Sequence, residues 1–149
     1  MATDPALLKK FSCFQDLSDE QLNAVANITD AVCYPPKHTI FEEGVMGKRL
    51  YFLLKGEVEI LFNTGKTNLM RIDVKTGETV MGCSVLMEPF MYAATNRSLT
   101  NVEVLEINVP ELMKLTEKDC QLGMSIQKLL INFMREYILR LRNLLGNRV

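Results

Sequence analysis

Glycines at short intervals divide the middle of the sequence into β-rich runs. Within residues 41–60 they are Gly44, Gly47 and Gly56. The segments 57–62 and 69–74 alternate between polar and apolar residues with the period of a strand, and residues 63–67 join them as a predicted hairpin. Short strands at regular spacing with glycine turns are typical of an antiparallel β-roll. The pattern therefore predicts a mainly β fold.

Helical patterns flank the β-rich region on both sides. Ser18 and Gln21 form a capping-box pattern ahead of an apolar helical spacing. After Pro110 the spacing is again helical, and residues 117–145 are predicted as one helix weakly interrupted at Gly123. A chain of 149 residues, 48% of them apolar, has the size of one domain. We expect a single domain, 1–149, with a helical lead-in at 1–30, the β-roll at 31–109 and C-terminal helices for dimerisation at 110–149.

A turn at Gly82 has the features of an anion site. Glycine takes the positive-φ conformations that a sharp turn needs before the short apolar segment 84–87. The backbone N–H groups of Ser84, Val85 and Leu86 would then open a helical turn without intrahelical acceptors, and such groups attract phosphate. The sequence predicts that an anion binds here.

The residues around Gly82 resemble the phosphate-binding cassette of the cyclic nucleotide-binding domains. Bacterial catabolite activator-type regulators, kinase regulatory subunits and some channels share this family. Its cassette is an aromatic residue, Gly, Glu, two small or apolar residues and Leu, followed by a loop and Arg-Ala-Ala/Ser-Thr. The corresponding residues here are Met81-Gly82-Cys83-Ser84-Val85-Leu86 and Tyr92-Ala93-Ala94-Thr95. Residues 41–60 also resemble the family's first signature, and the resemblance covers about residues 7–145.

The resemblance implies a fold and a ligand site. The fold is an antiparallel double-stranded β-helix, or jelly roll, with N-terminal helices and a long C-terminal helix. The ligand, cAMP or cGMP, would contact the cassette at Gly82, Cys83, Ser84, Val85, Tyr92, Ala93 and Ala94. Two of these residues depart from the family pattern. The family's Glu, which holds the ribose 2′-hydroxyl, is Cys83, and its Arg, which pairs with the cyclic phosphate, is Tyr92.

Both departures remove a charged partner of the nucleotide. A charge-assisted hydrogen bond contributes about 1.5–3 kcal/mol, or roughly ten- to a hundredfold in affinity. A tyrosine hydroxyl donates only a neutral hydrogen bond, and a thiol is a poor acceptor. We therefore expect weak or absent affinity for cAMP and cGMP. Two hypotheses stay open: a sensor that still binds a cyclic nucleotide or another anion at Gly82, and a structural dimerisation or protein-interaction module that binds no nucleotide. Filling of the pocket by Tyr92 or Phe90 would favour the second.

The last predicted helix carries more apolar surface than one core needs. Its residues Leu130, Met134, Tyr137, Leu141 and Leu144 are spaced 4, 3, 4 and 3, which is a heptad seam. The family's activator branch pairs through this helix, so the sequence predicts a homodimer. The alternative is that the helix only packs along its own barrel. In either case Phe133 or Tyr137 would offer an aromatic cover for a bound base.

Catalytic and metal chemistry find little support in the sequence. The single histidine, His38, has no acidic or thiol neighbour, so we expect no catalytic residues and no enzyme, with haem ligation by His38 as an alternative. The four cysteines lack metal-ligand spacing, which predicts reduced thiols and no zinc site. A reactive Cys83 at a helix N-terminus, serving as a redox sensor, is a further alternative.

The remaining expectations concern partners and location. The chain ends at Val149, directly after the long helix, where activators of this type carry a helix-turn-helix, so we expect no DNA binding. Lys128, Arg135 and Arg142 are interpreted as a solvated helix face. The sequence has neither a run of about 18 apolar residues nor the layout of a secretion signal. We expect a cytoplasmic protein that acts through a protein partner.

Overall fold

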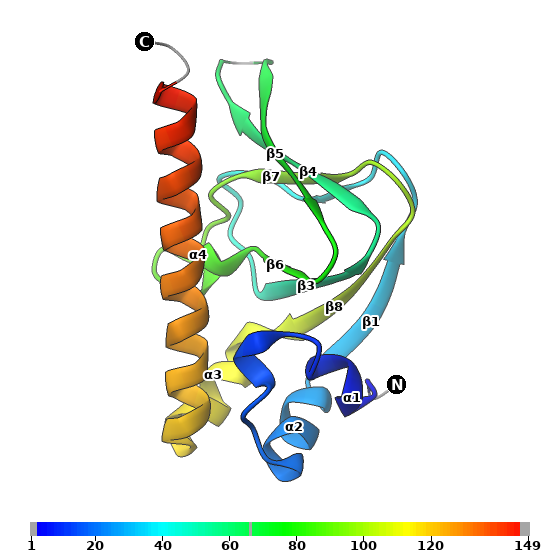
Figure 1. Ribbon diagram of the computed structural model, residues 1–149, viewed down its shortest axis with the longest axis vertical. Coiled ribbons are helices and arrows are strands. Elements are labelled where there is room, and N and C mark those ends of the chain that lie inside the picture. The colour runs from blue at the N-terminus through cyan, green and yellow to red at the C-terminus, as the bar shows by residue number, and fades with distance from the viewer. Residues whose placement is uncertain (1–2, 66, 147–149) are drawn as a thin grey trace.

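The computed structural model describes residues 3–65 and 67–146, which leaves Lys66 of the predicted hairpin and the two ends of the predicted domain outside the described residues. The described residues form two four-stranded antiparallel sheets that face each other (Figure 1). In one sheet the order is β1 (Thr29–Tyr34), β8 (Val102–Asn108), β3 (Arg49–Lys55) and β6 (Thr79–Met81). In the other it is β2 (Thr39–Phe41), β7 (Thr95–Ser98), β4 (Glu57–Asn63) and β5 (Leu69–Thr76). The expected jelly roll is confirmed.

Helices lie at both ends of the chain, as expected. They are α1 (Pro5–Leu8), the 3₁₀ turn η1 (Ser12–Phe14), α2 (Asp19–Ala26), α3 (Val109–Lys118) and α4 (Cys120–Gly146). A further 3₁₀ turn, η2 (Cys83–Leu86), lies between β6 and β7. The predicted capping box is present, because Gln21 donates its backbone N–H to Ser18 Oγ at 3.2 Å and accepts from the Ser18 backbone at 2.8 Å. No helix among the described residues is long and apolar enough to cross a membrane.

The break between the two C-terminal helices lies at Asp119, so the predicted interruption at Gly123 is wrong. Asp119 has an extended backbone, with φ −132° and ψ 100°. Its Oδ1 accepts from the backbone N–H of Leu122 at 3.1 Å. An aspartate that caps the first turn of a helix starts a new helix there, whereas Gly123 continues inside α4.

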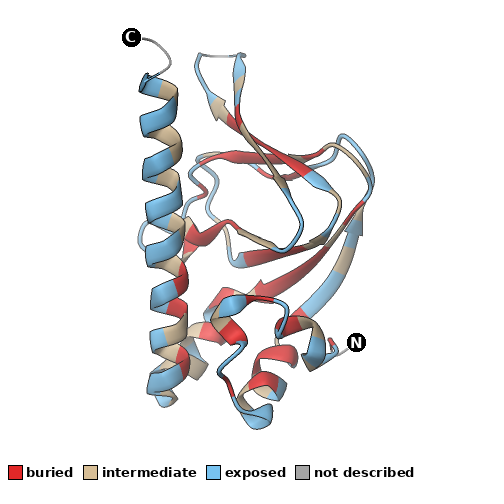
Figure 2. Cartoon of the chain, viewed as in Figure 1, coloured by how far each residue is buried: buried red, intermediate tan, exposed pale blue. Residues whose placement is uncertain are grey.

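The core joins the β1–β8–β3–β6 sheet to the N-terminal helices and to the first half of α4 (Figure 2). On α4 the buried residues are Leu122, Ile126 and Leu129. The second half of the helix runs beside the open side of the barrel, next to β5 and β6, and is mostly exposed (Figures 1 and 2). The long helix therefore covers the barrel with only one of its faces.

The β4–β5 hairpin pairs as expected from the sequence, but the strict alternation is wrong along β4, because Glu59 and Leu61, at the positions expected to face outward, are buried as well. Val58 and Ile60 point into the core. Glu59, expected to be solvated, is only 5% exposed. Its carboxylate accepts from Arg71 on β5 at 3.0 Å and from Arg97 on β7 at 2.8 Å. Two arginines from the flanking strands thus cover this carboxylate.

Candidate ligand pocket

The cassette has the predicted turn but not all of the predicted free donors. Gly82 has φ 81°, in the left-handed region, and begins η2 as expected. The N–H of Val85 donates to the carbonyl oxygen of Gly82 at 3.3 Å. The N–H of Ala93 donates to Ser84 Oγ at 3.1 Å. The prediction of unpaired N–H groups at residues 84–86 is therefore wrong for Val85, because the turn is a 3₁₀ turn that uses this donor internally.

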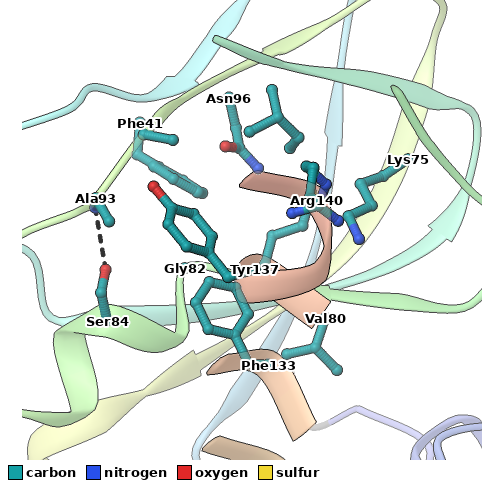
Figure 3. Close-up of a pocket in the computed structure, with 13 residues that line it drawn as sticks. Phe41, Lys75, Val80, Gly82, Ser84, Ala93, Asn96, Phe133, Tyr137 and Arg140 are labelled. Carbon is teal, nitrogen blue, oxygen red and sulfur yellow. Dashed lines mark hydrogen bonds between the residues drawn. The ribbon is translucent and has the colours of Figure 1, made fainter. Parts of the chain in front are cut away.

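A small cavity lies between the cassette, the barrel interior and α4 (Figure 3). Its cassette residues are Met81, Gly82, Ser84, Ala93 and Ala94, and its α4 residues are Phe133, Tyr137 and Arg140. The free space inside it is about 30 Å³, which is room for about two water molecules. Pockets for drug-sized ligands have volumes of about 300–1,000 Å³. The cavity is therefore too small for such a ligand in this conformation.

Three of the predicted cassette residues do not line this cavity. Val85 and Cys83 are fully buried in the core, and Tyr92 is only 5% exposed. The sequence reasoning placed all three in contact with a ligand because the family motif is contiguous there. In the structure Met81, Gly82 and Ser84 of the first segment and Ala93 and Ala94 of the second line the cavity, while the side chains of Cys83 and Val85 point into the core.

Tyr92, at the position of the family's arginine, is part of the aromatic core beside the cavity. Its ring stacks on Phe41 with a centroid distance of 4.1 Å. Its hydroxyl donates to the carbonyl oxygen of Arg49 at 2.9 Å. A Cβ on Gly47 would lie 2.2 Å from Cε2 of this ring. Gly47 is therefore required by the close approach of Tyr92, and the tyrosine hydroxyl already has a partner within the protein.

Cys83, at the position of the family's glutamate, is an inert thiol. Burial raises its pKa above the usual range, and the thiol of Cys13 adds to this effect. Burial also raises the pKa of Cys13, to about 12. A thiolate is the reactive form of cysteine. The interpretation of Cys83 as a redox sensor with a lowered pKa is therefore wrong.

Aromatic residues of α4 close the cavity on the side away from the barrel. Tyr137 packs against Phe62 of β4 with a ring distance of 5.7 Å, and against Phe133 at 6.0 Å. Both residues were expected to offer an aromatic cover, and both line the cavity. Phe90, which was considered as a residue that fills the pocket, is 40% exposed and lies outside it.

Charged residues that the sequence analysis did not single out form the remaining wall. Arg140 of α4 contacts Asp73 of β5 at 2.8 Å, and Lys75 contacts the same carboxylate at 3.7 Å. Burial lowers the pKa of Lys75, and the neighbouring Arg140 lowers it further, while Asp73 and Glu136 act in the opposite direction. A signal was present in the sequence, because Arg140 follows Phe133 and Tyr137 at helical spacing on an otherwise apolar face.

Only part of the predicted seam of α4 is exposed in the single chain. Tyr137 lies on β4, and Leu130 and Leu144 pack partly against the core. Met134 is 44% exposed, and Leu141 is half-buried. Tyr137 and Leu144 of the predicted seam lie on the same side of the helix as Phe133, and this side packs against the barrel. The apolar residues of α4 that are more exposed than Met134 are Met124, Ile131, Ile138 and Leu145.

The other predicted candidates lie away from the cavity. The ring of His38 stacks on Tyr34 at 4.8 Å and is exposed at the surface, so the alternative of haem ligation finds no support here. In residues 3–65 and 67–146, no group of three His, Cys, Asp or Glu side chains is arranged to hold a metal ion.

Comparison with known proteins relates the chain to one family. Residues 31–119 match the cyclic nucleotide-binding domain. No curated protein sequence matches the chain. A cyclic nucleotide-binding protein of Geobacter metallireducens GS-15 is similar in structure, with a TM-score of 0.77, 26% identity, and coverage of 87% of this chain and 94% of that chain.

Two further similarities show the fold. The catabolite activator protein of Thermus thermophilus has a TM-score of 0.73 and 20% identity, with 89% of this chain and 62% of that chain covered. The regulatory domain of Toxoplasma gondii PKA, in a crystal with cAMP, has a TM-score of 0.75 and 16% identity, with 89% and 49% covered. Since the family match spans more than half of the chain, this protein belongs to the cyclic nucleotide-binding domain family.

Proposed function

We propose that this protein is a non-catalytic regulatory module whose affinity for cAMP and cGMP is weak or absent. The observation that carries the proposal is the position of Tyr92, which replaces the family's arginine and is buried against Phe41 with its hydroxyl on Arg49. A cyclic phosphate near Ser84 and Ala93 would then meet no cation from the cassette, because residues 81–87 and 92–95 contain no Lys or Arg.

The cost of this replacement is large for a phosphate ligand. A charge-assisted hydrogen bond to phosphate is worth about 1.5–3 kcal/mol, and its loss weakens binding about ten- to a hundredfold. Cys83 would not compensate, since its thiol is buried and does not line the cavity. Together the two replacements argue for a site that a cyclic nucleotide occupies poorly.

Any larger ligand would also have to displace the residues that close the cavity. Three of them, Phe133, Tyr137 and Arg140, belong to α4. Entry of a ligand would therefore move these side chains or the helix itself. A regulatory signal would in this way pass from the pocket to the exposed face of α4.

A second function, dimerisation, is supported by the exposed side of α4. Met124, Ile131, Ile138 and Leu145 recur every seven residues and are 60–65% exposed. Met134 lies three residues after Ile131, and these positions correspond to a and d of a heptad. Met87 of the cassette loop borders the same groove. We propose that a second copy of this chain covers this face, because a heptad seam is complementary to itself and a large exposed apolar stripe is unfavourable in water.

Titration calorimetry with cAMP and cGMP tests the ligand proposal. Four proteins are compared: the unaltered chain, Cys83→Glu, Tyr92→Arg and the double variant. We expect weak or undetectable binding except in the double variant, which regains both charged partners. Circular dichroism must show each variant folded, because Glu at position 83 enters a fully buried site. Tight cAMP binding by the unaltered chain would refute the proposal.

A further inference from the structure

The cavity has positive charge at the end opposite to the cassette. Figure 3 shows Ser84 and Ala93 on one side, Lys75 and Arg140 on the other, and the rings of Phe133 and Tyr137 between them. Lys75 and Arg140 are the cations of the cavity wall, and they come from β5 and α4. The charged end is therefore separate from the family cassette.

The two charged side chains that line the cavity are both cations. Lys75 and Arg140 share the single carboxylate of Asp73. The side chain of Arg140 is 15% exposed and that of Lys75 22% exposed, so water screens them only partly. Glu136 is nearby, but its side chain is 60% exposed and contacts Arg135. Asp73 and Glu136 both lie close enough to act on Lys75, but neither of these carboxylates lines the cavity.

The other residues of the cavity wall can contact an apolar part of a ligand. Phe41, Val80, Phe133 and Tyr137 supply aromatic and aliphatic surface, and the amide of Asn96 and the hydroxyl of Ser84 are the polar groups between them. A ligand that combined a ring with one anionic group would bury the ring against these residues and place its charge on the cations. Apolar walls with a few convergent polar groups are typical of small-molecule sites.

We infer that the pocket binds a small organic anion, a carboxylate, sulfonate or phosphate on an apolar ring, whose charge lies between Lys75 and Arg140 rather than on the cassette. This inference rests on the proposed regulatory function and names its ligand class. A cavity of about 150 Å³ accepts a benzene ring, so the rings of Phe133 and Tyr137 move apart when such a ligand enters the present space of about 30 Å³. Because Arg140 belongs to α4, the anionic group of the ligand then contacts this helix directly.

The probe for the test is phenyl phosphate, compared with phenol and inorganic phosphate at constant ionic strength, by calorimetry and by amide chemical shifts. Phenyl phosphate has both ring and charge, and each control compound lacks one of them. We expect phenyl phosphate to bind at least about tenfold more tightly than either, since both parts of the site are then filled. Phosphate that binds as tightly as phenyl phosphate, or no saturable binding of phenyl phosphate at millimolar concentration, would overturn the inference.

Three variants of the charged residues test this inference, because two of them should lower the affinity for phenyl phosphate and one should raise it. Lys75→Gln and Arg140→Gln remove a cation and should weaken phenyl phosphate binding about ten- to a hundredfold. Asp73→Asn removes the competing carboxylate and should strengthen it about three- to tenfold. The asparagine oxygen can still accept from the backbone N–H of Val74, as Asp73 Oδ1 does at 2.8 Å, so the local fold is retained.

The signs separate ligand binding from a purely structural role. If Asp73 and Arg140 only clamp α4 to β5, Asp73→Asn and Arg140→Gln change the affinity in the same direction, and the inference is wrong. Arg142→Gln on the exposed side of α4 and Glu78→Gln after β5 are matched charge controls, and both positions are exposed. Equal effects at these control positions would also overturn it.

The result is independent of the test of the proposed function. Tight binding of cAMP to the unaltered chain would refute the proposed weak affinity for cyclic nucleotides. The affinities of the variants for phenyl phosphate would still test the role of Lys75 and Arg140. Conversely, weak cAMP binding together with unchanged phenyl phosphate affinity in Lys75→Gln and Arg140→Gln would leave the proposed function standing and refute the charge assignment.

Discussion

Placing glutamates at two positions of the exposed α4 face should separate the proposed dimer. Ile131 and Ile138 are 65% and 62% exposed in the single chain. Full burial of such a side chain is worth about 1.5–3 kcal/mol, so burial of the exposed part contributes about 1–2 kcal/mol each. A twofold dimer buries each residue twice, and the four side chains together contribute about 4–8 kcal/mol.

The double variant Ile131→Glu/Ile138→Glu loses this contribution and brings like charges together. Since about 1.4 kcal/mol is tenfold in an equilibrium constant, the dissociation constant should rise by about three to six orders of magnitude. Sedimentation equilibrium or light scattering over a concentration series measures the change. The fold should persist, because both side chains are exposed in the single chain.

The matched control adds the same charge beside the seam. Asn132 directly follows Ile131, is exposed and lies about 100° around the helix. Asn132→Glu should leave the dimer intact, while the single variant Ile131→Glu should weaken it. A monomeric unaltered chain, or equal weakening by Asn132→Glu, would refute the reasoning.

Three further predictions concern the packing of the cassette and the buried acid. Gly47→Ala should destabilise the protein by about 1–3 kcal/mol in urea unfolding, because the new Cβ meets the Tyr92 ring. In the double variant with Tyr92→Ala, part of this loss should disappear. If the loss in the double variant equals the sum of the two single losses, the contact does not explain the effect. Tyr92→Phe should cost about 1 kcal/mol of stability in urea unfolding through the lost hydrogen bond to the Arg49 carbonyl oxygen; an unchanged free energy of unfolding would contradict this role of the hydroxyl. Burial alone would raise the pKa of Glu59, but the hydrogen bonds from its two arginine partners outweigh this and hold the pKa below its usual value. Glu59 therefore contributes stability that is present above the pKa of an unfolded glutamate and is lost as the pH falls through the lower folded value. In urea titrations between pH 7 and pH 3, the free energy of unfolding of Glu59→Gln should therefore depend less on pH than that of the unaltered chain.

Local patterns in the sequence were sufficient for the fold and for the cassette turn. Strand alternation and glycine spacing depend on neighbouring residues, so they predicted the β4–β5 hairpin, the left-handed Gly82 and the Ser18 capping box correctly. The family motif likewise placed Gly82, Ser84, Ala93 and Ala94 at the cavity. The strand pairing, the glycine turn and the helix cap follow from local backbone geometry, which a single sequence records directly, whereas the position of the cavity came from the family resemblance.

The tertiary structure decided which side chains face the cavity and which face solvent. A helix seam can be counted from the sequence in more than one register, and only the packing of Tyr137 on β4 shows which side of α4 is left exposed. Arg140 and Lys75 are 65 residues apart and meet only because β5 and α4 lie side by side, at a carboxylate they share. Whether Tyr92 reaches a ligand likewise depends on the room left by Gly47, a residue 45 positions earlier. Such contacts depend on distances between elements, and local periodicity carries no information about them.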